Sequence, residues 1–289
     1  MGIEKYIQVT SISEVLSCLG GTSPARIICG GTDMVISLRE GSLGEHIILV
    51  DISRVKELQQ ITQDGQYIEI GAAAVMADIA ESSCIAESSL ILHHAARSVG
   101  SPQIRSRGTI GGNIVTSAQC ADTIPALLAL DAQITLMNSE QSVRTLPISQ
   151  FLTGPKQTDI RNDELLISVR FPSLAGGVYR GSYYKLIRRA AVAKSRMSFA
   201  LISAQDRQGI VEDIRISIGS ALSTHGRFKE AEKMLIGKKA SLDAVEKTAE
   251  CCVSQVVEQT GIRWSSAYKL PVIKDVLCRE LETLLEMED

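Results

Sequence analysis

Two short glycine-rich segments most constrain what this chain can fold into. The first is CGGTD at residues 29–33, which stands between the apolar runs RIIC and MVI, and the second is TIGGN at 109–113. Glycine tolerates positive φ and lets another backbone or a ligand come close. Successive main-chain N–H groups at such a turn form a concave anion site, to which a nearby threonine or asparagine adds neutral donors. The pair therefore predicts two turns facing each other across an anion such as a pyrophosphate.

Each diglycine alone has a simpler explanation. A tight hairpin or a β-bulge also places two glycines between apolar runs. Neither segment is a G-x-G-x-x-G or a G-x-x-x-x-G-K-[ST], so the Rossmann and P-loop fingerprints are both absent. The similar flanks of the two segments are what favour a shared binding function.

The bulk properties indicate a globular protein of two or three domains. A chain of 289 residues exceeds what most single cores reach, and its 45% hydrophobic and 22% charged residues are ordinary. No apolar run approaches the roughly 20 residues that span a bilayer. The N-terminal MGIEKYIQVTS lacks a basic region followed by an apolar stretch, so we expect a cytoplasmic protein without a membrane partner. The net charge of -3 argues against a nucleic-acid partner.

The cysteines and histidines do not suggest a metal centre. None of the seven cysteines forms a C-x-x-C pair, which structural zinc and iron–sulfur sites usually require. Cys251 and Cys252 fit a helix as small buried hydrophobes. His93 and His94 are neighbours on a predicted helix, where adjacent side chains point about 100° apart, so they are poor joint ligands. We predict no metal in this chain.

The first 55 residues are typical of a small α/β unit. Ser11 and Glu14 fit a capping box that opens a short helix, which Gly20 and Gly21 end. Strand patterns follow at 26–29, 46–53 and 67–75, with an apolar continuation to Leu38 after the first glycine turn. A helical region from 76 to 99 leads to the second glycine segment, and residues 132–137 and 164–172 have strand character.

The chain changes character at PSLAGGVYRG, residues 172–181, which is the best linker candidate. Three strands are predicted beyond it, at 182–188, 198–205 and 211–221. Three helices follow, beginning near Gly226, Ser241 and Pro271. Strands followed by helices without alternation indicate an α+β domain whose helices cover one sheet face.

Two stretches carry a family resemblance. CGGTDMV, together with VGSPQIRSRGTIGGNIVTSAQCADTIPALLALDA, closely resembles the FAD-binding subunit of molybdenum hydroxylases, the group of xanthine, carbon monoxide and nicotinate dehydrogenases. The order of segments matches over essentially the whole chain. The resemblance implies an α+β fold: a two-part PCMH-type FAD-binding domain over 1–55 and 56–175, then a C-terminal domain at 178–289 with a three-stranded sheet covered by three helices.

The resemblance also implies which residues hold FAD. In that family the two glycine-rich segments grip the FAD pyrophosphate from opposite sides. The first contact segment is Ile27, Ile28, Cys29, Gly30, Gly31, Thr32 and Asp33. The second is Thr109, Gly111, Gly112, Asn113, Val115 and Thr116, with Val99 ahead of it.

Three further residues match family positions near the cofactor, and each has a structural alternative. Asp122 matches an aspartate that holds the adenosine or ribityl part, although a helix N-cap explains it too. Leu166 matches a leucine packed near the cofactor, and core packing explains it nearly as well. Lys185 matches a lysine near the flavin ring, where a cation would stabilise the reduced flavin; a solvated strand lysine is the alternative.

This sequence departs from the family pattern at two cysteines. Cys29 stands where relatives more often carry alanine or valine, and AQCAD, with Cys120, replaces a pattern of small residues and proline. The cysteine-bearing insertion that holds an extra iron–sulfur cluster in some relatives is absent. The sequence does not define a role for either cysteine.

The implied function is electron transfer within a complex. No G-x-S-x-G, H-E-x-x-H or comparable nucleophile motif is present, so a cofactor would supply the chemistry. The resemblance implies a heterotrimer in which a [2Fe–2S] small subunit reduces FAD on this chain, which then reduces NAD⁺ or another acceptor. Hydroxylation belongs to a molybdopterin-binding large subunit, most simply in a xanthine dehydrogenase-like complex. The alternatives are a stand-alone flavin-dependent oxidoreductase with its own substrate, and a non-catalytic assembly protein.

Overall fold

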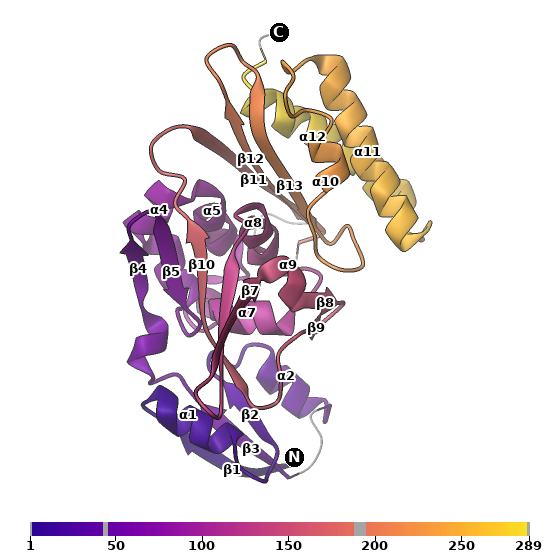
Figure 1. The fold of residues 1–289 in the computed structure, drawn as a ribbon. Coiled ribbons are helices and arrows are strands. Elements are labelled where there is room, and N and C mark those ends of the chain that lie inside the picture. The colour runs from indigo at the N-terminus through magenta and orange to yellow at the C-terminus, as the bar shows by residue number, and fades with distance from the viewer. Residues whose placement is uncertain (1, 43–45, 188–194, 288–289) are drawn as a thin grey trace.

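The structure is a computed structural model that describes residues 2–42, 46–187 and 195–287 (Figure 1). The elements up to the second glycine segment are β1 (Ile3–Gln8), α1 (Ile12–Leu19), β2 (Ala25–Ile28), α2 (Met34–Arg39), β3 (Ile47–Asp51), the 3-10 helix η1 (Lys56–Gln59), β4 (Ile61–Asp64), β5 (Tyr67–Gly71), α3 (Met76–Glu81), α4 (Ser83–Ser88), α5 (Leu90–Ser98) and α6 (Pro102–Arg105). The remaining elements are α7 (Ile110–Thr116), α8 (Thr123–Ala129), β6 (Gln133–Asn138), β7 (Val143–Pro147), α9 (Ile148–Phe151), β8 (Leu152–Gly154), β9 (Gln157–Thr158), β10 (Glu164–Pro172), β11 (Tyr179–Leu186), β12 (Met197–Gln205), β13 (Val211–Gly219), α10 (Lys229–Glu232), α11 (Leu242–Thr260) and α12 (Ser266–Leu284). The described residues form three larger sheets with their covering helices and one small two-stranded sheet of β8 and β9.

The N-terminal unit is a parallel three-stranded sheet in the order β1-β3-β2, flanked by α1 and α2. The predicted capping box is present in a shifted form: the Ser11 hydroxyl accepts from Glu14 N–H, while the Glu14 carboxylate accepts from Thr10 N–H, one residue before the N-cap. The apolar continuation after CGGTD is the helix α2. Strand β1 was not predicted, because its mostly exposed residues lack a clear alternation.

The central sheet is antiparallel, in the order β4-β5-β10-β6-β7, and β10 lies in its middle. Its core is formed with α3, α5, α7 and α8. The single helical region predicted at 76–99 is three helices, because the chain breaks at Ser82 and Ser89. Each of these serines is the N-cap of the next helix, and its hydroxyl accepts a main-chain N–H.

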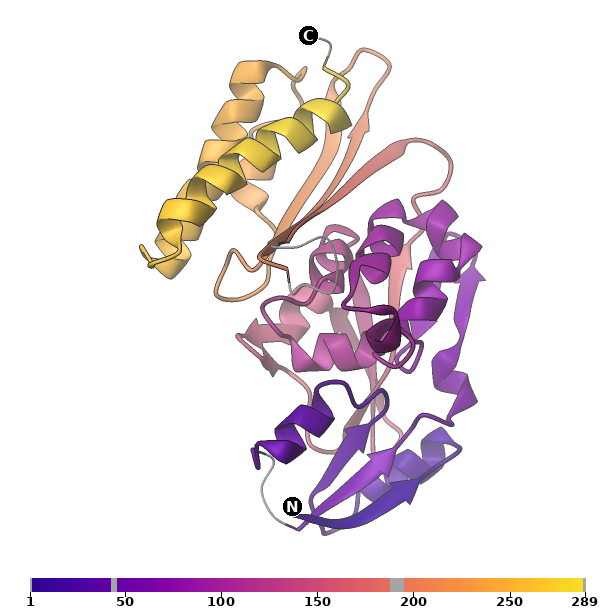
Figure 2. The same ribbon diagram turned by 180° about the vertical axis from the view of Figure 1, so that it is seen from behind.

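The C-terminal sheet, β11-β12-β13, separates two helical layers (Figures 1 and 2). Phe199 and Leu201 of β12 belong to the core shared with α10, α11 and α12. Ala200 and Ile202, which alternate with them, belong to the core shared with α5 and α8. The three-stranded sheet with three helices was therefore predicted correctly, and its other face packs on the central part of the molecule.

Two of the predicted C-terminal helix starts differ from the structure. The helix predicted near Gly226 is only the four residues of α10, and the last helix begins at Ser266, so that Pro271 lies inside it. Proline favours the first turn of a helix, which made Pro271 a plausible start. The preceding turn was missed because Ala267 and Tyr268 are exposed and add nothing to the apolar face. None of the described helices is long and apolar enough to cross a membrane.

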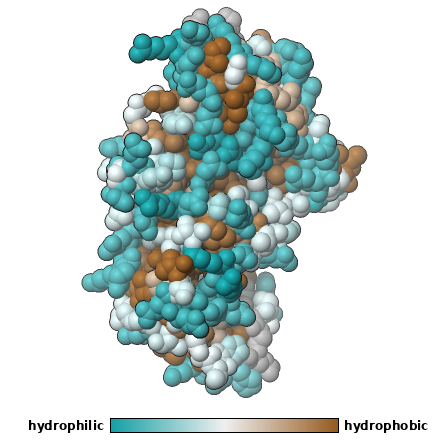
Figure 3. Space-filling view, viewed as in Figure 1, coloured by the Kyte–Doolittle hydropathy of each residue, from teal (hydrophilic) through white to brown (hydrophobic). Residues whose placement is uncertain are grey.

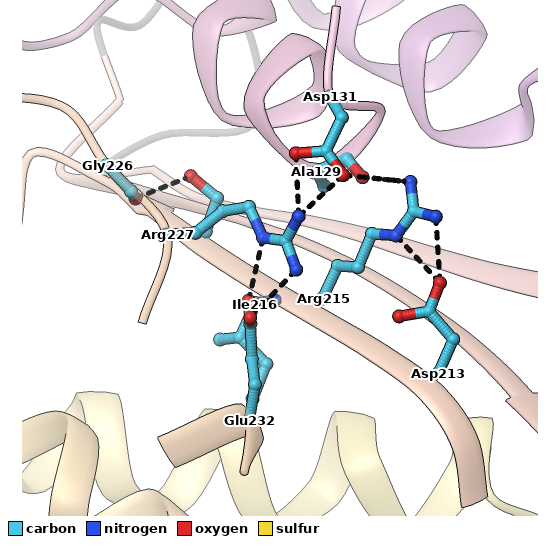
Figure 4. Close-up of polar contacts among 9 residues, drawn as sticks. Ala129, Asp131, Asp213, Arg215, Ile216, Gly226, Arg227 and Glu232 are labelled. Carbon is cyan, nitrogen blue, oxygen red and sulfur yellow. Dashed lines mark hydrogen bonds and ion pairs between the residues drawn. The ribbon is translucent and has the colours of Figure 1, made fainter. Parts of the chain in front are cut away.

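A network of ion pairs joins the central part to the C-terminal sheet (Figure 4). Arg227 donates to both carboxylate oxygens of Asp131 at 2.7 Å, and also to Glu232 at 2.8 and 3.0 Å. Arg215 on β13 donates to the Ala129 carbonyl at 3.2 Å, and it pairs with Asp131 at 3.4 Å. Asp131, just after α8, is therefore the carboxylate that forms ion pairs with both arginines of the C-terminal part of the chain.

We expect Asp131→Asn to weaken this junction. Asparagine has nearly the same side-chain shape as aspartate and tolerates the positive φ of residue 131. It removes the negative charge with which both arginines pair. Because Asp131 is half exposed, the expected loss of unfolding free energy is about 1 kcal/mol, smaller at high salt. Urea denaturation at low and high ionic strength measures it. Asp64→Asn, which removes an exposed pair with Arg170, is the control, and an equal loss there would contradict a specific junction role.

Candidate functional site

The first glycine segment lies at the carboxyl edge of the parallel sheet. Strands β2 and β3 run parallel and end at Ile28 and Asp51, so the loop after β2 and the loop after β3 emerge side by side. Ligands of open α/β sheets bind at this edge, where loops leave the strands. Gly31 has φ of +73°, a conformation that favours glycine, and it turns the chain from β2 into α2.

The main chain of this loop offers hydrogen-bond donors that have no partner in residues 2–42, 46–187 and 195–287. Among the described residues, no atom accepts a hydrogen bond from the N–H groups of Gly30, Gly31, Thr32 or Asp33. Four consecutive N–H groups before the first turn of a helix form a concave, partially positive surface. The loop therefore fits the predicted anion cradle.

The second glycine segment differs from the predicted turn, because Gly111 and Gly112 lie in the first turn of α7. Its N–H groups are already paired: Ile110 donates to the Ala74 carbonyl at 3.0 Å, Gly111 to that of Ala72 at 2.9 Å, and Gly112 to the Thr109 hydroxyl at 3.1 Å. A Cβ on Gly111 would lie 2.6 Å from the Ala72 oxygen. Glycine at 111 thus serves close packing of α7 on the chain after β5, and the segment does not supply a second set of free main-chain donors.

Side chains supply the polar groups of the second segment. The Asn113 Oδ1 accepts from the Thr123 hydroxyl at 2.7 Å, which orients the side-chain amide and leaves its NH₂ group for another partner. The Thr116 hydroxyl forms no hydrogen bond with the described residues. The two segments therefore contribute different donors, main-chain on one side and side-chain on the other.

The two segments approach each other although about eighty residues separate them. A Cβ on Gly30 would lie 1.9 Å from the Arg107 carbonyl oxygen and 3.1 Å from the Gly108 Cα. A Cβ on Gly108 would lie 3.6 Å from the Thr32 hydroxyl oxygen. The backbone of the first segment is therefore in direct contact with residues 107–108, directly before the second segment, and Gly30 is the residue whose missing side chain permits it. The two segments lie close together, and their shared grip on a pyrophosphate stays a prediction.

One pocket runs between the two segments. It is lined by nearly every predicted site residue: Ile27, Ile28, Cys29, Gly30, Gly31, Thr32, Asp33, Val99, Thr109, Gly111, Gly112, Asn113, Val115, Thr116 and Leu166. It is also lined by residues that sequence reasoning missed: Met34, Ile52, Ala72, Met76, Ile104, Gly108, Ile160 and Leu165. Gly108, Met34 and Leu165 could have been found, since each adjoins a predicted site residue directly in sequence. The others come from four separate segments, around Ile52, Ala72 to Met76, Ile104 and Ile160, that only the tertiary structure brings together.

Asp122 and Lys185 are the predicted site residues that do not line this pocket. Their side chains, 7% and 9% exposed, form a salt bridge with 2.8 Å between Lys185 Nζ and Asp122 Oδ2. Lys185 also donates to the Ser98 carbonyl at 2.6 Å, and Asp122 Oδ1 accepts from the Ser195 hydroxyl at 2.8 Å. Asp122 occupies the N-cap position of α8 without capping it, and Lys185 is not a solvated strand lysine.

This ion pair connects the residues next to two walls of the pocket, the wall at Val99 and the wall at Asn113. Ser98 directly precedes Val99, and Asp122 directly precedes Thr123, which orients Asn113. Burial raises the pKa of Asp122, and the Lys185 ammonium opposes that rise. Lys185 therefore links β11 of the C-terminal sheet to both walls at once.

The pocket contains little acid–base chemistry of its own. Asp33 is its one carboxylic acid, and Cys29 is its one thiol among the described lining residues. Burial, with a smaller effect of Asp51, raises the pKa of Cys29 to about 11, so it remains a neutral thiol near pH 7. The described residues hold no group of three or more histidine, cysteine or acidic side chains suited to a metal. A pocket with anion-binding donors and apolar walls suits a bound cofactor.

Comparison with known proteins identifies the class. Residues 2–174 match the family model described as the FAD binding domain in molybdopterin dehydrogenase, and residues 182–284 match the CO dehydrogenase flavoprotein C-terminal domain. Carbon monoxide dehydrogenase from Hydrogenophaga pseudoflava superimposes with a TM-score of 0.88 at 25% identity, over 98% of this chain and 97% of that one. The fold is thus that of a flavin-carrying medium subunit.

Curated relatives agree along the whole length. The glyceraldehyde dehydrogenase medium chain of Sulfolobus acidocaldarius is 32% identical over 93% of this chain and 94% of that protein. The xanthine dehydrogenase FAD-binding subunit of Escherichia coli O157:H7 is 29% identical over 93% and 91%. The chain belongs to the family of FAD-binding medium subunits of molybdenum hydroxylases, and its cofactor is FAD.

Proposed function

We propose that this chain holds FAD in the pocket between its two glycine segments and passes electrons from a [2Fe–2S] subunit to NAD⁺ or another acceptor. The observation that carries the proposal is the row of N–H groups at Gly30–Asp33 from which no described residue accepts, in a loop whose backbone contacts residues 107–108 directly before the second segment. Four donors without an acceptor in the part of the chain that the structure describes suit the pyrophosphate of a dinucleotide. FAD supplies the capacity to take up electrons and release them to an acceptor.

The residues of the pocket divide that task. The N–H groups of Gly30 to Asp33 hold the pyrophosphate from one side, and the Asn113 amide and the Thr109 and Thr116 hydroxyls hold the cofactor from the other. Apolar side chains such as Val99, Val115 and Leu166 exclude water from the walls. We assign Asp122 and Lys185 to positioning these walls, since both are turned into a buried ion pair outside the pocket.

The complex we propose has a molybdopterin-binding large subunit and a [2Fe–2S] small subunit. The support is the nature of the relatives, which are medium chains and FAD-binding subunits of glyceraldehyde and xanthine dehydrogenases. We propose hydroxylation of a purine such as xanthine as the activity of the complex, with aldehydes as the second substrate class to test. The substrate is bound on the large subunit, so this pocket does not select it.

A stand-alone oxidoreductase is less well supported. A flavoenzyme with its own substrate needs acid–base groups beside the flavin. Asp33, which is exposed, and the neutral Cys29 are the titratable side chains among the described lining residues. The pocket can therefore bind a cofactor but offers few groups that could move a substrate proton.

Purification from the native host tests the proposal. The isolated chain should be yellow, with flavin absorbance near ~450 nm, and should oxidise none of xanthine, glyceraldehyde or nicotinate by itself. The native complex should contain FAD, iron and molybdenum, and it should reduce NAD⁺ or a dye with one of these substrates. A colourless chain would favour an assembly protein, and turnover by the chain alone would favour the stand-alone enzyme.

A further inference from the structure

The turn between α11 and α12 presents two large apolar side chains to solvent. Trp264, the one tryptophan of the chain, is 97% exposed, and Ile262 is 84% exposed. Figure 3 shows hydrophobic residues projecting where α11 ends, at the right-hand edge of the molecule. In Figures 1 and 2 this end of the helix pair stands away from the central sheet. We call residues 261–268 the apolar tip.

The backbone of the apolar tip is fixed although its side chains are free. Gly261 ends α11 with φ of +64°, and its N–H donates to the Val257 carbonyl at 2.8 Å. Arg263 N–H donates to the Ser266 hydroxyl at 2.8 Å, and Arg263 Nε donates to the Thr260 carbonyl at 3.2 Å. An exposed aromatic on a fixed backbone loses little freedom on binding, which is typical of interface hot spots.

Positive charge surrounds the apolar tip. The Arg196 guanidinium lies 4.9 Å from the centre of the Tyr268 ring, and Arg263 is part of the tip itself. Burial lowers the pKa of Lys269, and the neighbouring charges of Arg263 and Arg196 lower it further. None of these three cations forms an ion pair with a carboxylate of the described residues. The surroundings of the tip stay net positive although they include one carboxylate, that of Glu258, one turn back on α11.

This charge distribution selects the kind of partner. A second copy of the chain would bring its own cations against these ones, and facing like charges cost several kcal/mol at an interface. Tryptophan and isoleucine need an apolar recess, and the surrounding cations need carboxylates. We propose that the apolar tip docks into an apolar pocket, rimmed by acidic side chains, on another subunit of the molybdenum hydroxylase complex. This inference rests on the proposed function, which supplies such a subunit.

The test uses the native complex, purified through a tag on this chain. Trp264→Ala should lower the molybdenum and iron bound per FAD at least tenfold, while FAD per chain stays unchanged, because the tip is far from the pocket-lining residues in sequence and fold. Leu242→Ser is the matched control: Leu242 is 66% exposed at the other end of α11, about 28 Å away, and should have no effect. Arg263→Glu should release the partner at lower salt than Arg263→Gln does.

Each outcome separates the tip from the proposed function. Wild-type protein that carries FAD but never molybdenum or iron would overturn the proposed function. A wild-type complex with both metals, combined with an unchanged Trp264→Ala complex, would overturn the docking inference alone. In the isolated chain, a blue shift of the single tryptophan with rising concentration, together with a dimer that Trp264→Ala abolishes, would show that a second copy occupies the tip. That result would also overturn the inference.

Discussion

Gly30→Ala should abolish retention of FAD. The new Cβ would lie 1.9 Å from the Arg107 carbonyl oxygen and 2.6 Å from its carbon, so the two glycine segments would have to separate. Both neighbours are main-chain atoms, and the clash cannot be relieved by a side-chain rotation. Separation would displace the N–H groups of Gly30 to Asp33 from the side-chain donors of α7. We expect FAD affinity to fall at least a hundredfold, which corresponds to about 2.7 kcal/mol.

Flavin content after purification and titration of the flavin-free protein with FAD measure this effect. Gly226→Ala is the control, since its Cβ would meet only Leu222 Cδ1 at 3.8 Å, an ordinary contact. Circular dichroism separates loss of FAD from loss of fold. A folded Gly30→Ala protein that binds FAD as tightly as the wild type would show that contact between the segments is not needed for the site.

Lys185→Met should destabilise the protein by about 3–5 kcal/mol, because it leaves the buried Asp122 carboxylate without its cation. The double variant Lys185→Met/Asp122→Asn should recover most of the loss, since no uncompensated charge remains. Urea denaturation of both variants measures the difference. Equal stability of wild type and Lys185→Met would contradict the role of this pair in joining β11 to the pocket walls.

The deficit of Lys185→Met should depend on pH in one direction. Burial already raises the pKa of Asp122 in the folded state, and loss of the Lys185 charge raises it further. A carboxyl group with a raised folded pKa costs stability above that pKa, and the cost disappears as the pH falls through it and the group takes up a proton. The variant should therefore approach wild-type stability as the pH is lowered from neutral. A deficit that grows on acidification would contradict this assignment.

Measurements with and without FAD distinguish positioning from direct contact. If Lys185 acts only through Asp122 and the Ser98 carbonyl, the stability deficit arises in the protein itself and should be nearly the same in flavin-free and FAD-loaded protein. The family resemblance implies that Lys185 lies near the flavin ring, and if it also contacts the flavin, the FAD-loaded protein should lose more. FAD affinity of Lys185→Met, measured by titration, provides the same comparison independently.

Local sequence patterns predicted the elements that have strong local causes. The capping box at Ser11 and Glu14 gave α1, and the alternating run at 164–172 gave β10. Local patterns failed where tertiary packing decides. Residues 110–116 form a helix that Thr109 caps, and Gly111 lets it pack against Ala72, a contact between segments that are distant in sequence. The start of α12 was missed because its first turn faces solvent.

The sequence by itself determined the family and both glycine segments, because close backbone approach at Gly30 and Gly111 requires a residue without a side chain. Only the tertiary structure decided which hydrogen-bond donors each segment offers to the cofactor. It pairs the first N–H groups of α7 within the protein, gives those of Gly30 to Asp33 no acceptor among the described residues, and turns Asp122 and Lys185 toward each other. Hydrogen-bond partners and burial depend on neighbours brought together by folding, and a residue's type alone does not specify them.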